Sequence, residues 1–348
     1  MQDAEKIITH SIVDKNMQTF TGQGRSIADC ISNMNAWGKN RIPFLFILDF
    51  ELEKPIVLPL ADIEERGLKF SIGNNRAENV RGSDDPYNLL EKIPVSFETY
   101  RSGFQNVMQA IQGGDTYLLN LCYSTKIVGS LSLEEIFEKA NAPYKLLWPG
   151  KFVCFSPEQF VSIKDGVIRT FPMKGTIDAS LPGAEQMLLD DLKEQEEHAT
   201  VVDLLRNDLS IVASKVTVDR YRFISKIHTR GKTLLQTSSE ISGRLDDDYL
   251  EHLGDIIHAL LPAGSVSGAP KKKTVEIIHA TEPEKRGYYT GVFGVFDGQN
   301  LDSAVMIRMI EQREDGFYYR SGGGITYRSE ANAEYQEMID KVYIPGRP

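Results

Sequence analysis

Cysteine is scarce in this sequence of 348 residues. The three cysteines, Cys30, Cys122 and Cys154, are widely spaced and odd in number, and none belongs to a CxxC pair. This pattern excludes a zinc site built from thiolates. It also fits a reducing compartment, so a cytoplasmic protein is expected.

The sequence also lacks a basic cluster, a signal-like leader and a long apolar run. Its formal net charge is −10, and beyond residues 271–273 no group of lysines could give the basic face that a nucleic acid requires. The first residues are polar and acidic, whereas a signal peptide begins basic and then becomes apolar. No run approaches the length of a membrane-spanning helix. We therefore expect no nucleic-acid partner and no membrane.

Motifs that bind nucleotide phosphates are missing as well. Residues 262–271, PAGSVSGAPK, read as a loop of small residues that runs into a helix, and a helix N-terminus attracts anions. The loop is not a Walker A motif, because Gly264 and Gly268 lie one residue too close and no Gly-Lys-Ser/Thr follows. No GxGxxG follows a predicted strand either, so nucleotide binding is disfavoured.

The sequence does contain many apolar runs separated by turn-formers, a pattern typical of strands. Asp165-Gly166, Asp297-Gly298 and Asp315-Gly316 predict three β-hairpins. The expected fold class is therefore α+β, with large, mostly antiparallel sheets flanked by helices. Strands are predicted at 43–50, 55–60, 68–72, 116–126 and 304–310, and helices at 96–112, 183–205 and 330–342.

Residues 1–94 are interpreted as a strand-rich opening segment that is integrated into the fold, and residues 95–345 as the region that carries the chemistry. The polar stretch 79–94, with Gly82, Pro86 and Pro94, is the candidate connection between them. No catalytic pattern occurs in the opening segment.

Residues 321–341, SGGGITYRSEANAEYQEMIDK, place a glycine run beside a helix that carries carboxylates. We expect the glycines to turn with positive φ and to direct several N–H groups at one anion, and Ser329 to cap the helix. Glu334, Glu337 and Lys341 share one stripe of that helix and could hold a hard cation. The alternative is a solvated helix face with ordinary ion pairs.

Glu197 and Arg308 are further candidates for a site. Glu197 falls in register with Val201 and Leu204, and a carboxylate on an apolar stripe needs a partner such as a metal or a base. Arg308 alternates with apolar neighbours in a predicted strand, so it could point inward and bind a carboxylate. It could equally be a surface arginine on an edge strand.

Lys174 and Glu158 form a candidate nucleophile and acid. Lys174, in FPMKGT, follows the Asp165-Gly166 hairpin in a turn constrained by proline and glycine, and it could act as a nucleophile if burial lowered its pKa. Glu158, in SPEQF, starts the same hairpin and should lie nearby. The alternative for Lys174 is an exposed lysine without a role.

Six segments together resemble the chorismate-utilising enzymes: SPEQF, PMKGT, EEHATVVDLLRNDLS, AGSVSGAPK, AVMIRM and SGGGITYRSEANAEYQEMIDK. The resemblance runs from about residue 98 to residue 342, and PMKGT is similar to aminodeoxychorismate synthase component I in particular. It implies a Mg²⁺-dependent enzyme that acts on the dicarboxylate chorismate on the route to para-aminobenzoate and folate. It also implies a fold of two large sheets packed face to face, with helices outside.

The same resemblance assigns roles to residues. Glu158 would be the general acid that helps the C4 hydroxyl of chorismate leave as water. Lys174 would add to C2 before ammonia enters at C4. Glu197, Glu334 and Glu337 would hold Mg²⁺, for which oxygen ligands are suited. The substrate-binding residues would be Ser265, Ser267, Arg308, Gly323, Gly324 and Lys341.

Lys174 decides the branch of the family, because anthranilate and isochorismate synthases resemble the chain elsewhere but carry alanine there. Leu118 stands where isochorismate and salicylate synthases have a lysine that activates water, so water is disfavoured as the nucleophile. Gln236 stands where the family commonly has histidine. No cysteine sits in a Gly-x-Cys-x-Gly elbow, so a separate glutamine amidotransferase subunit is implied as the source of ammonia. Anthranilate synthase component I and a non-catalytic chorismate-binding subunit remain alternatives.

Overall fold

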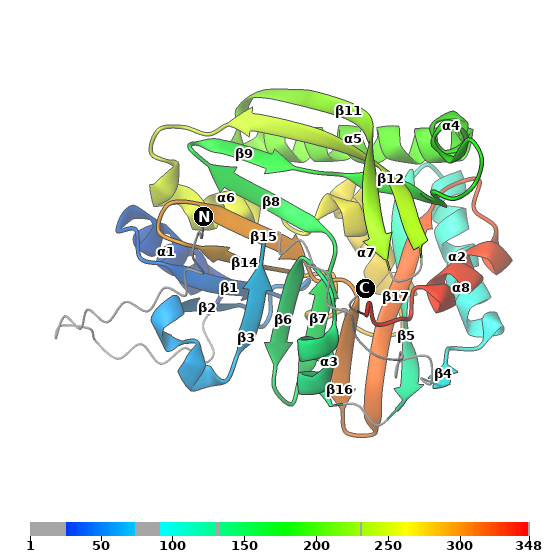
Figure 1. Cartoon of the computed structure of the whole chain (residues 1–348), viewed down its shortest axis with the longest axis horizontal. Helices are drawn as coiled ribbons and strands as arrows, with labels where there is room; N and C mark the ends of the chain where they lie inside the picture. The colour runs from blue at the N-terminus through cyan, green and yellow to red at the C-terminus, as the bar shows by residue number, and fades with distance from the viewer. Residues whose placement is uncertain (1–25, 74–90, 130–131, 230–231, 347–348) are drawn as a thin grey trace.

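The computed structural model describes residues 26–73, 91–129, 132–229 and 232–346. Residues 79–90 of the candidate connection lie outside these ranges. Within them the strands form two large sheets, and every strand pair is antiparallel. Figure 1 shows the helices around these sheets.

The first sheet has nine strands in the described part of the chain, in the order β10-β12-β9-β8-β15-β14-β1-β2, with β11 also paired to β12. Each predicted Asp-Gly hairpin forms, two of them in this sheet, because Asp-Gly suits a tight reversal between strands. The strands are β1 (Phe44–Leu48), β2 (Ile56–Pro59), β8 (Gln159–Lys164), β9 (Val167–Thr170), β10 (Met173–Asp178), β11 (Ser214–Thr229), β12 (Lys232–Arg244), β14 (Val292–Phe296) and β15 (Leu301–Val305).

The second sheet has eight strands in the described ranges, in the order β13-β5-β17-β16-β7-β6-β3, with β4 paired to β5. The third Asp-Gly hairpin joins β16 to β17. The strands are β3 (Lys69–Ile72), β4 (Glu91–Ile93), β5 (Leu118–Val128), β6 (Tyr144–Trp148), β7 (Phe152–Ser156), β13 (Gly268–Ala269), β16 (Met309–Arg313) and β17 (Gly316–Ile325). Strands from the opening segment therefore join both sheets, while the boundary at residue 94 stays a prediction.

The two sheets pack face to face through alternate side chains. Leu45 and Ile47 of β1 lie in one cluster with Leu146 of β6 and Phe152 of β7, from the other sheet. Successive side chains of a strand point to opposite faces, so the intervening residues pack outward against helices. The predicted α+β class with two large antiparallel sheets is confirmed.

Helices cover the outer faces (Figure 1). One hydrophobic cluster joins α1, α5 and α6 to the first sheet. A second cluster joins α3 to the second sheet, and a third joins α2, α7 and α8 to that sheet. The helices are α1 (Ile27–Lys39), α2 (Phe97–Gln112), α3 (Leu133–Lys139), α4 (Ala184–Asp190), α5 (Leu192–Val212), α6 (Leu253–Ala259), α7 (Lys271–Thr281) and α8 (Ala331–Asp340).

Three predicted elements need correction. The helix expected at 183–205 is two helices, because Asp191 leaves the helical conformation and its side chain caps α5 by accepting from the N–H of Glu194. Ser329 does not cap α8; its hydroxyl lies 2.7 Å from Glu334 Oε1, and Glu330 is the N-cap. The strand expected at 304–310 is interrupted, because Arg308 has a φ of 53° between β15 and β16.

No helix in the described ranges is both long enough and apolar enough to cross a lipid bilayer.

Candidate active site

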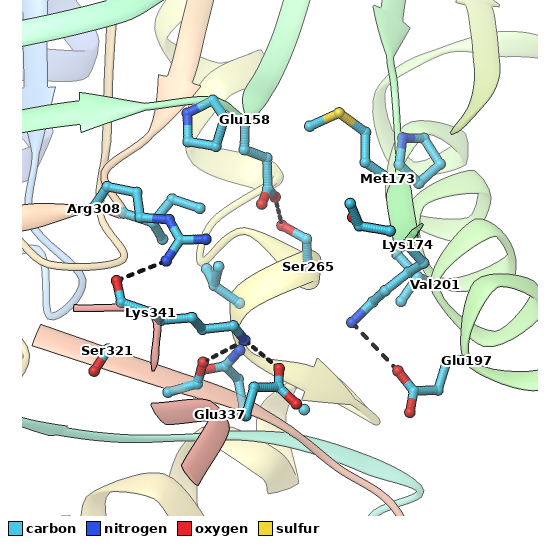
Figure 2. Close-up of a pocket in the computed structure, with 18 of the residues that line it drawn as sticks. Glu158, Met173, Lys174, Glu197, Val201, Ser265, Arg308, Ser321, Glu337 and Lys341 are labelled. Carbon is cyan, nitrogen blue, oxygen red and sulfur yellow. Dashed lines mark hydrogen bonds and ion pairs between the residues drawn. The ribbon is translucent and has the colours of Figure 1, made fainter. Parts of the chain in front are cut away.

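A cavity of about 420 Å³ opens where β10, the end of β17, α5, α8 and the loop before α7 meet. Its lining combines acids, bases and small residues from segments that are far apart in the sequence. Most of the predicted site residues line it: Glu158, Lys174, Glu197, Ser265, Arg308, Gly324, Glu334, Glu337 and Lys341. Figure 2 shows Glu158, Lys174 and Lys341 approaching the cavity from different sides.

The floor of the cavity is the open edge of β17. Pairing between β16 and β17 ends at Met309 and Arg320, and the positive φ of Arg308 turns the chain away from the ladder. Beyond this point β17 pairs on one side alone among the described strands, with β5. The Gly322 carbonyl accepts a hydrogen bond from Lys341 Nζ at 2.9 Å, so the unpaired edge of β17 faces that lysine. A strand residue presents its N–H and C=O on one side, so the N–H groups of Gly322 and Gly324 face the cavity too.

This arrangement corrects the expected turn at the glycine run. Gly322, Gly323 and Gly324 lie in β17 and are not among the glycines with positive φ. What they supply is space. A Cβ on Gly324 would lie 3.0 Å from Leu118 Cδ1 and 3.7 Å from Lys174 Nζ, so glycine keeps the cavity open there.

Gly323 and Ser267 were both expected to bind substrate, and neither lines the cavity in the described structure. Gly323 lies behind its wall, where a Cβ would meet Glu334, Glu337 and Lys341 at 3.3 to 3.7 Å. Ser267 is 1% exposed, and its hydroxyl donates to the Ala263 carbonyl at 2.8 Å. That hydroxyl stabilises the loop, while Ser265 is the loop serine that reaches the site.

Glu158 follows β7 at the top of the cavity, as drawn in Figure 2. Its backbone N–H donates to Ser156 Oγ at 3.1 Å, and its carbonyl accepts from Val305 N–H at 3.2 Å. The carboxyl accepts a short hydrogen bond from the Ser265 hydroxyl. Desolvation raises the pKa of Glu158 above its ordinary value, against the opposing effects of Ser265, Lys174 and Arg308. The carboxyl is therefore suited to hold a proton that it can donate.

Lys174 lies on β10 at a break in its register with β12. The register shifts between Lys174 and Thr176, where Gly175 has a φ of 70°, and the Thr237 hydroxyl donates to the Lys174 carbonyl. The side chain enters the cavity, and its Nζ lies 3.8 Å from Glu197 Oε2 (Figure 2). The backbone irregularity thus directs an amine toward the space that Glu158 also faces.

Arg308 and Lys341 supply positive charge on another side of the cavity. Arg308 Nη1 donates to the Lys341 carbonyl at 2.9 Å, and Lys341 Nζ pairs with Glu337 Oε1 at 2.6 Å. Arg308 Nε is buried and has no hydrogen-bond partner in the described part of the chain. A buried donor without a partner is rare, and an anionic ligand would satisfy it.

Three carboxylates were expected to bind a metal ion, and they line the same cavity. Glu334 and Glu337 both lie beside Gly323, while Glu197 approaches from α5. As these side chains stand, no group of three acidic, histidine or cysteine residues in the described ranges is close enough to hold a metal. Glu337 and Glu197 instead pair with the ammonium groups of Lys341 and Lys174. The oxygen donors fit Mg²⁺ in kind, and the ion would replace the two ammonium groups as their counter-charge.

Several lining residues were not predicted as site residues. Arg320 is 7% exposed and pairs with Glu311 and Glu284 at 3.1 and 3.3 Å, and Asn120 and Tyr289 line the same cavity. Arg320 stands two residues before Gly322, and residues two apart on a strand lie on the same face. This spacing is the signal that could have identified Arg320 from the sequence. Gln236 also lines the cavity, with its amide 3.5 Å from Thr176 Oγ1.

Comparisons with known proteins identify the family of the chain. The family model described as chorismate binding enzyme matches residues 61–345. A Haemophilus influenzae protein named as an uncharacterized PabA-like protein is 52% identical over 315 residues, covering 90% of this chain and 96% of that protein. Aminodeoxychorismate synthase component 1 of Salmonella typhimurium is 34% identical over 261 residues, which are 70% of this chain and 56% of the enzyme.

The fold comparison gives the same result. The crystal structure of anthranilate synthase component I from Streptococcus pneumoniae has a TM-score of 0.63 and 26% identity, covering 85% of this chain and 70% of that one. The resemblance drawn from the six sequence segments is confirmed, and the chain belongs to the family of chorismate binding enzymes.

Proposed function

We propose that the chain replaces the C4 hydroxyl of chorismate by an amino group, forming 4-amino-4-deoxychorismate. The observation that carries this proposal is that Lys174 shares one cavity with Glu158, whose pKa is raised by desolvation. The first supplies a nucleophile and the second supplies an acid, which is what exchange of a poor leaving group requires. The relative from Salmonella typhimurium carries the name of this activity.

The two carboxylates of chorismate would be bound by the positive side of the cavity. Arg308, with its unpartnered Nε, and Lys341 supply charge, and the N–H groups on the open edge of β17 supply hydrogen bonds. The charges of Arg308 and Lys341 lower the pKa of Glu158 and so oppose the effect of its burial. A bound dianion offsets their charge, so substrate binding should raise the pKa of Glu158 further and keep its proton in place.

The reaction balances with these two side chains. Lys174, whose ammonium group pairs with Glu197, first gives one proton to solvent. Glu158 then gives its proton to the C4 hydroxyl, which leaves as water while the amine of Lys174 forms a bond to C2. Ammonia then attacks C4, the double bond returns, and the C2–N bond to Lys174 breaks. The proton that ammonia loses restores Glu158. The net change is chorismate plus ammonia giving aminodeoxychorismate plus water.

Mg²⁺ would be held by Glu197, Glu334 and Glu337, and it would supply positive charge for the ring carboxylate of the substrate. The protein's own contribution is to bring these acids to one cavity and to keep Lys341 beside it. Leu118 stands against Gly324 as an apolar side chain that cannot deprotonate water. We infer that the nucleophile at C4 is ammonia, supplied by a glutamine amidotransferase partner.

Chorismate consumption, followed together with pyruvate release, tests the proposed reaction. With ammonium and Mg²⁺ we expect chorismate to be consumed without pyruvate, because the enolpyruvyl group stays on the ring. Pyruvate released in step with chorismate would indicate anthranilate synthesis. Unchanged chorismate under all conditions would favour a non-catalytic binding subunit.

A further inference from the structure

Helix α5 carries a buried histidine directly after Glu197. His198 is 0% exposed, and its Nε2 lies 2.6 Å from the hydroxyl of Ser239 on β12. Its other ring nitrogen, Nδ1, has no hydrogen-bond partner in the described part of the chain. The bond to Ser239 is thus the hydrogen bond that the structure shows for this ring, and a polar side chain that is fully buried needs such a partner.

Ser239 is the residue at which the strands around Lys174 are joined. Its N–H donates to the Pro172 carbonyl at 3.0 Å, two residues before Lys174. Its hydroxyl accepts the N–H of Arg222 at 2.9 Å, at a register shift of β11. The neighbouring Thr237 hydroxyl donates to the Lys174 carbonyl. β12 therefore holds the segment 172–174 from both ends.

Among the contacts of the described residues, two link α5 to that segment. One is the ion pair between Glu197 and Lys174, at 3.8 Å inside the cavity. The other is the bond between His198 and Ser239, buried behind it. Glu197 and His198 are consecutive on one helix, so fixing the imidazole also fixes the rotation and the height of the helix at Glu197. The ion pair between Glu197 and Lys174 is therefore accompanied by a hydrogen bond between His198 and Ser239.

We propose that His198 is a positioning residue, which holds α5 on β12 and so sets the distance between the Glu197 carboxylate and the Lys174 amine. The proposal rests on the proposed function in taking Lys174 as the nucleophile. It concerns a side chain that does not line the cavity and does not touch the substrate.

Replacing His198 by glutamine or by asparagine gives a matched pair of variants, because both side chains end in an amide. The terminal group of glutamine reaches about as far as Nε2 of histidine, whereas that of asparagine reaches about as far as Nδ1. We expect His198→Gln to keep the bond to Ser239 and stay within about threefold of the wild-type kcat. His198→Asn should lower kcat by about ten- to a hundredfold, with a smaller change in KM, because a misplaced nucleophile affects the reacting step.

A double-variant comparison tests whether the effect passes through Ser239. If it does, His198→Asn combined with Ser239→Ala should lower kcat no further than the worse single variant. Additive losses would contradict the proposal. Equal losses of kcat in His198→Gln and His198→Asn would also contradict it. The proposal requires the hydrogen bond to Ser239, which the glutamine side chain can reach and the asparagine side chain cannot.

A labelling experiment tests the same point without any enzymatic activity. The rate at which a small acylating reagent modifies Lys174 is measured by peptide mass analysis, with exposed Lys164 as the internal reference. If His198 sets the Glu197–Lys174 distance, His198→Asn should raise Lys174 labelling about threefold or more, and His198→Gln should not. Unchanged labelling in His198→Asn would overturn the positioning role even if amination is confirmed. Altered labelling without amination would retain that role and reject the proposed reaction.

Discussion

Glu158 and Lys174 carry the proposed reaction, and each owes its position to an irregularity in the backbone. Glu158 follows β7 in the connection to β8, where Ser156 holds its N–H. Lys174 sits at a register shift of β10 that Gly175 permits with a φ of 70°. Regular strands would direct alternate side chains to opposite faces, so these breaks allow both groups to reach one cavity.

Replacing Lys174 by alanine tests the nucleophile. We expect Lys174→Ala to lower amination by about a thousandfold or more, because the step that expels the hydroxyl loses its attacking group. Chorismate binding should persist, since Arg308 and Lys341 remain. Steady-state rates and equilibrium binding measure the two effects, with Lys164→Ala on the neighbouring hairpin as the surface-lysine control. Full amination by Lys174→Ala would exclude the nucleophilic role.

The raised pKa of Glu158 predicts a pH-dependent difference in stability between the protein and its Glu158→Gln variant. The folded state binds this proton more tightly than the unfolded state, so the contribution is fully present below the unfolded pKa and is lost as pH rises through the folded pKa. Glu158→Gln should therefore gain in unfolding temperature relative to the wild type as the pH rises above the ordinary pKa of a glutamate.

Thermal unfolding at several pH values measures this difference. Glu314→Gln, in the exposed turn between β16 and β17, is the control and should show no such trend. If the unfolding temperature of the wild type instead rises relative to that of Glu158→Gln as the pH increases, burial does not destabilise the ionised carboxyl.

At the scale of elements, the site depends on where β16 stops pairing with β17. The ladder ends at Arg320, which leaves the glycine residues with an open edge that faces Lys341. Their sequence indicated a turn, because three glycines permit positive φ. Pairing with β5 instead keeps them extended, and that pairing is a long-range contact that local pattern cannot reveal.

A pair of glycine substitutions distinguishes the side of β17 beside Lys174 from the side beside α8. At Gly324 an added methyl group would lie 3.0 Å from the buried Leu118 and would intrude beside Lys174. Gly324→Ala should therefore weaken chorismate binding by about tenfold or more. At Gly323 an added methyl group would lie 3.3 to 3.7 Å from the ends of Glu334, Glu337 and Lys341. Gly323→Ala should therefore displace the proposed Mg²⁺ ligands and weaken binding chiefly when Mg²⁺ is present.

Binding titrations and thermal unfolding of both variants give the comparison. Loss of binding in Gly324→Ala that appeared only with Mg²⁺, as expected for Gly323→Ala, would show that the space beside Lys174 is not the substrate surface.

The elements differ in how well the sequence predicted them, for physical reasons. The three Asp-Gly hairpins depend on local turn chemistry, and all three were predicted correctly. The break at Arg308 and the division of 183–205 at Asp191 were missed, since apolar periodicity continued across both. Ser267 and Ser265 look alike in the sequence, and only the folded loop separates the buried hydroxyl from the one that reaches Glu158.

At the scale of the whole molecule, the cavity draws on both sheets and on helices from distant parts of the chain. Lys174 comes from the first sheet, the glycine edge from the second, and the acids from α5 and α8. Six linked sequence segments predicted this gathering because each matched a segment of one family, whereas spacing alone left every residue with a second interpretation. The metal-binding role of Glu197, Glu334 and Glu337 stays a prediction.

The chain by itself should use ammonia but not glutamine. Cys30, Cys122 and Cys154 are all buried, and desolvation raises the pKa of Cys122 to about 11, so these thiols are unsuited to attack glutamine. With purified chain we expect amination from ammonium salts and none from glutamine, measured by product formation under matched conditions. Glutamine-driven turnover by the chain alone would contradict the inferred amidotransferase partner.

The most direct test of the central claim is the position of nitrogen in the product. The purified chain is incubated with chorismate, Mg²⁺ and ¹⁵N-ammonium, and the product is analysed by mass spectrometry and NMR. The proposed chemistry predicts ¹⁵N bonded to C4, one hydroxyl lost as water and the enolpyruvyl group retained. Nitrogen at C2, as in anthranilate, would contradict the assignment of Lys174 and Glu158 to amination at C4.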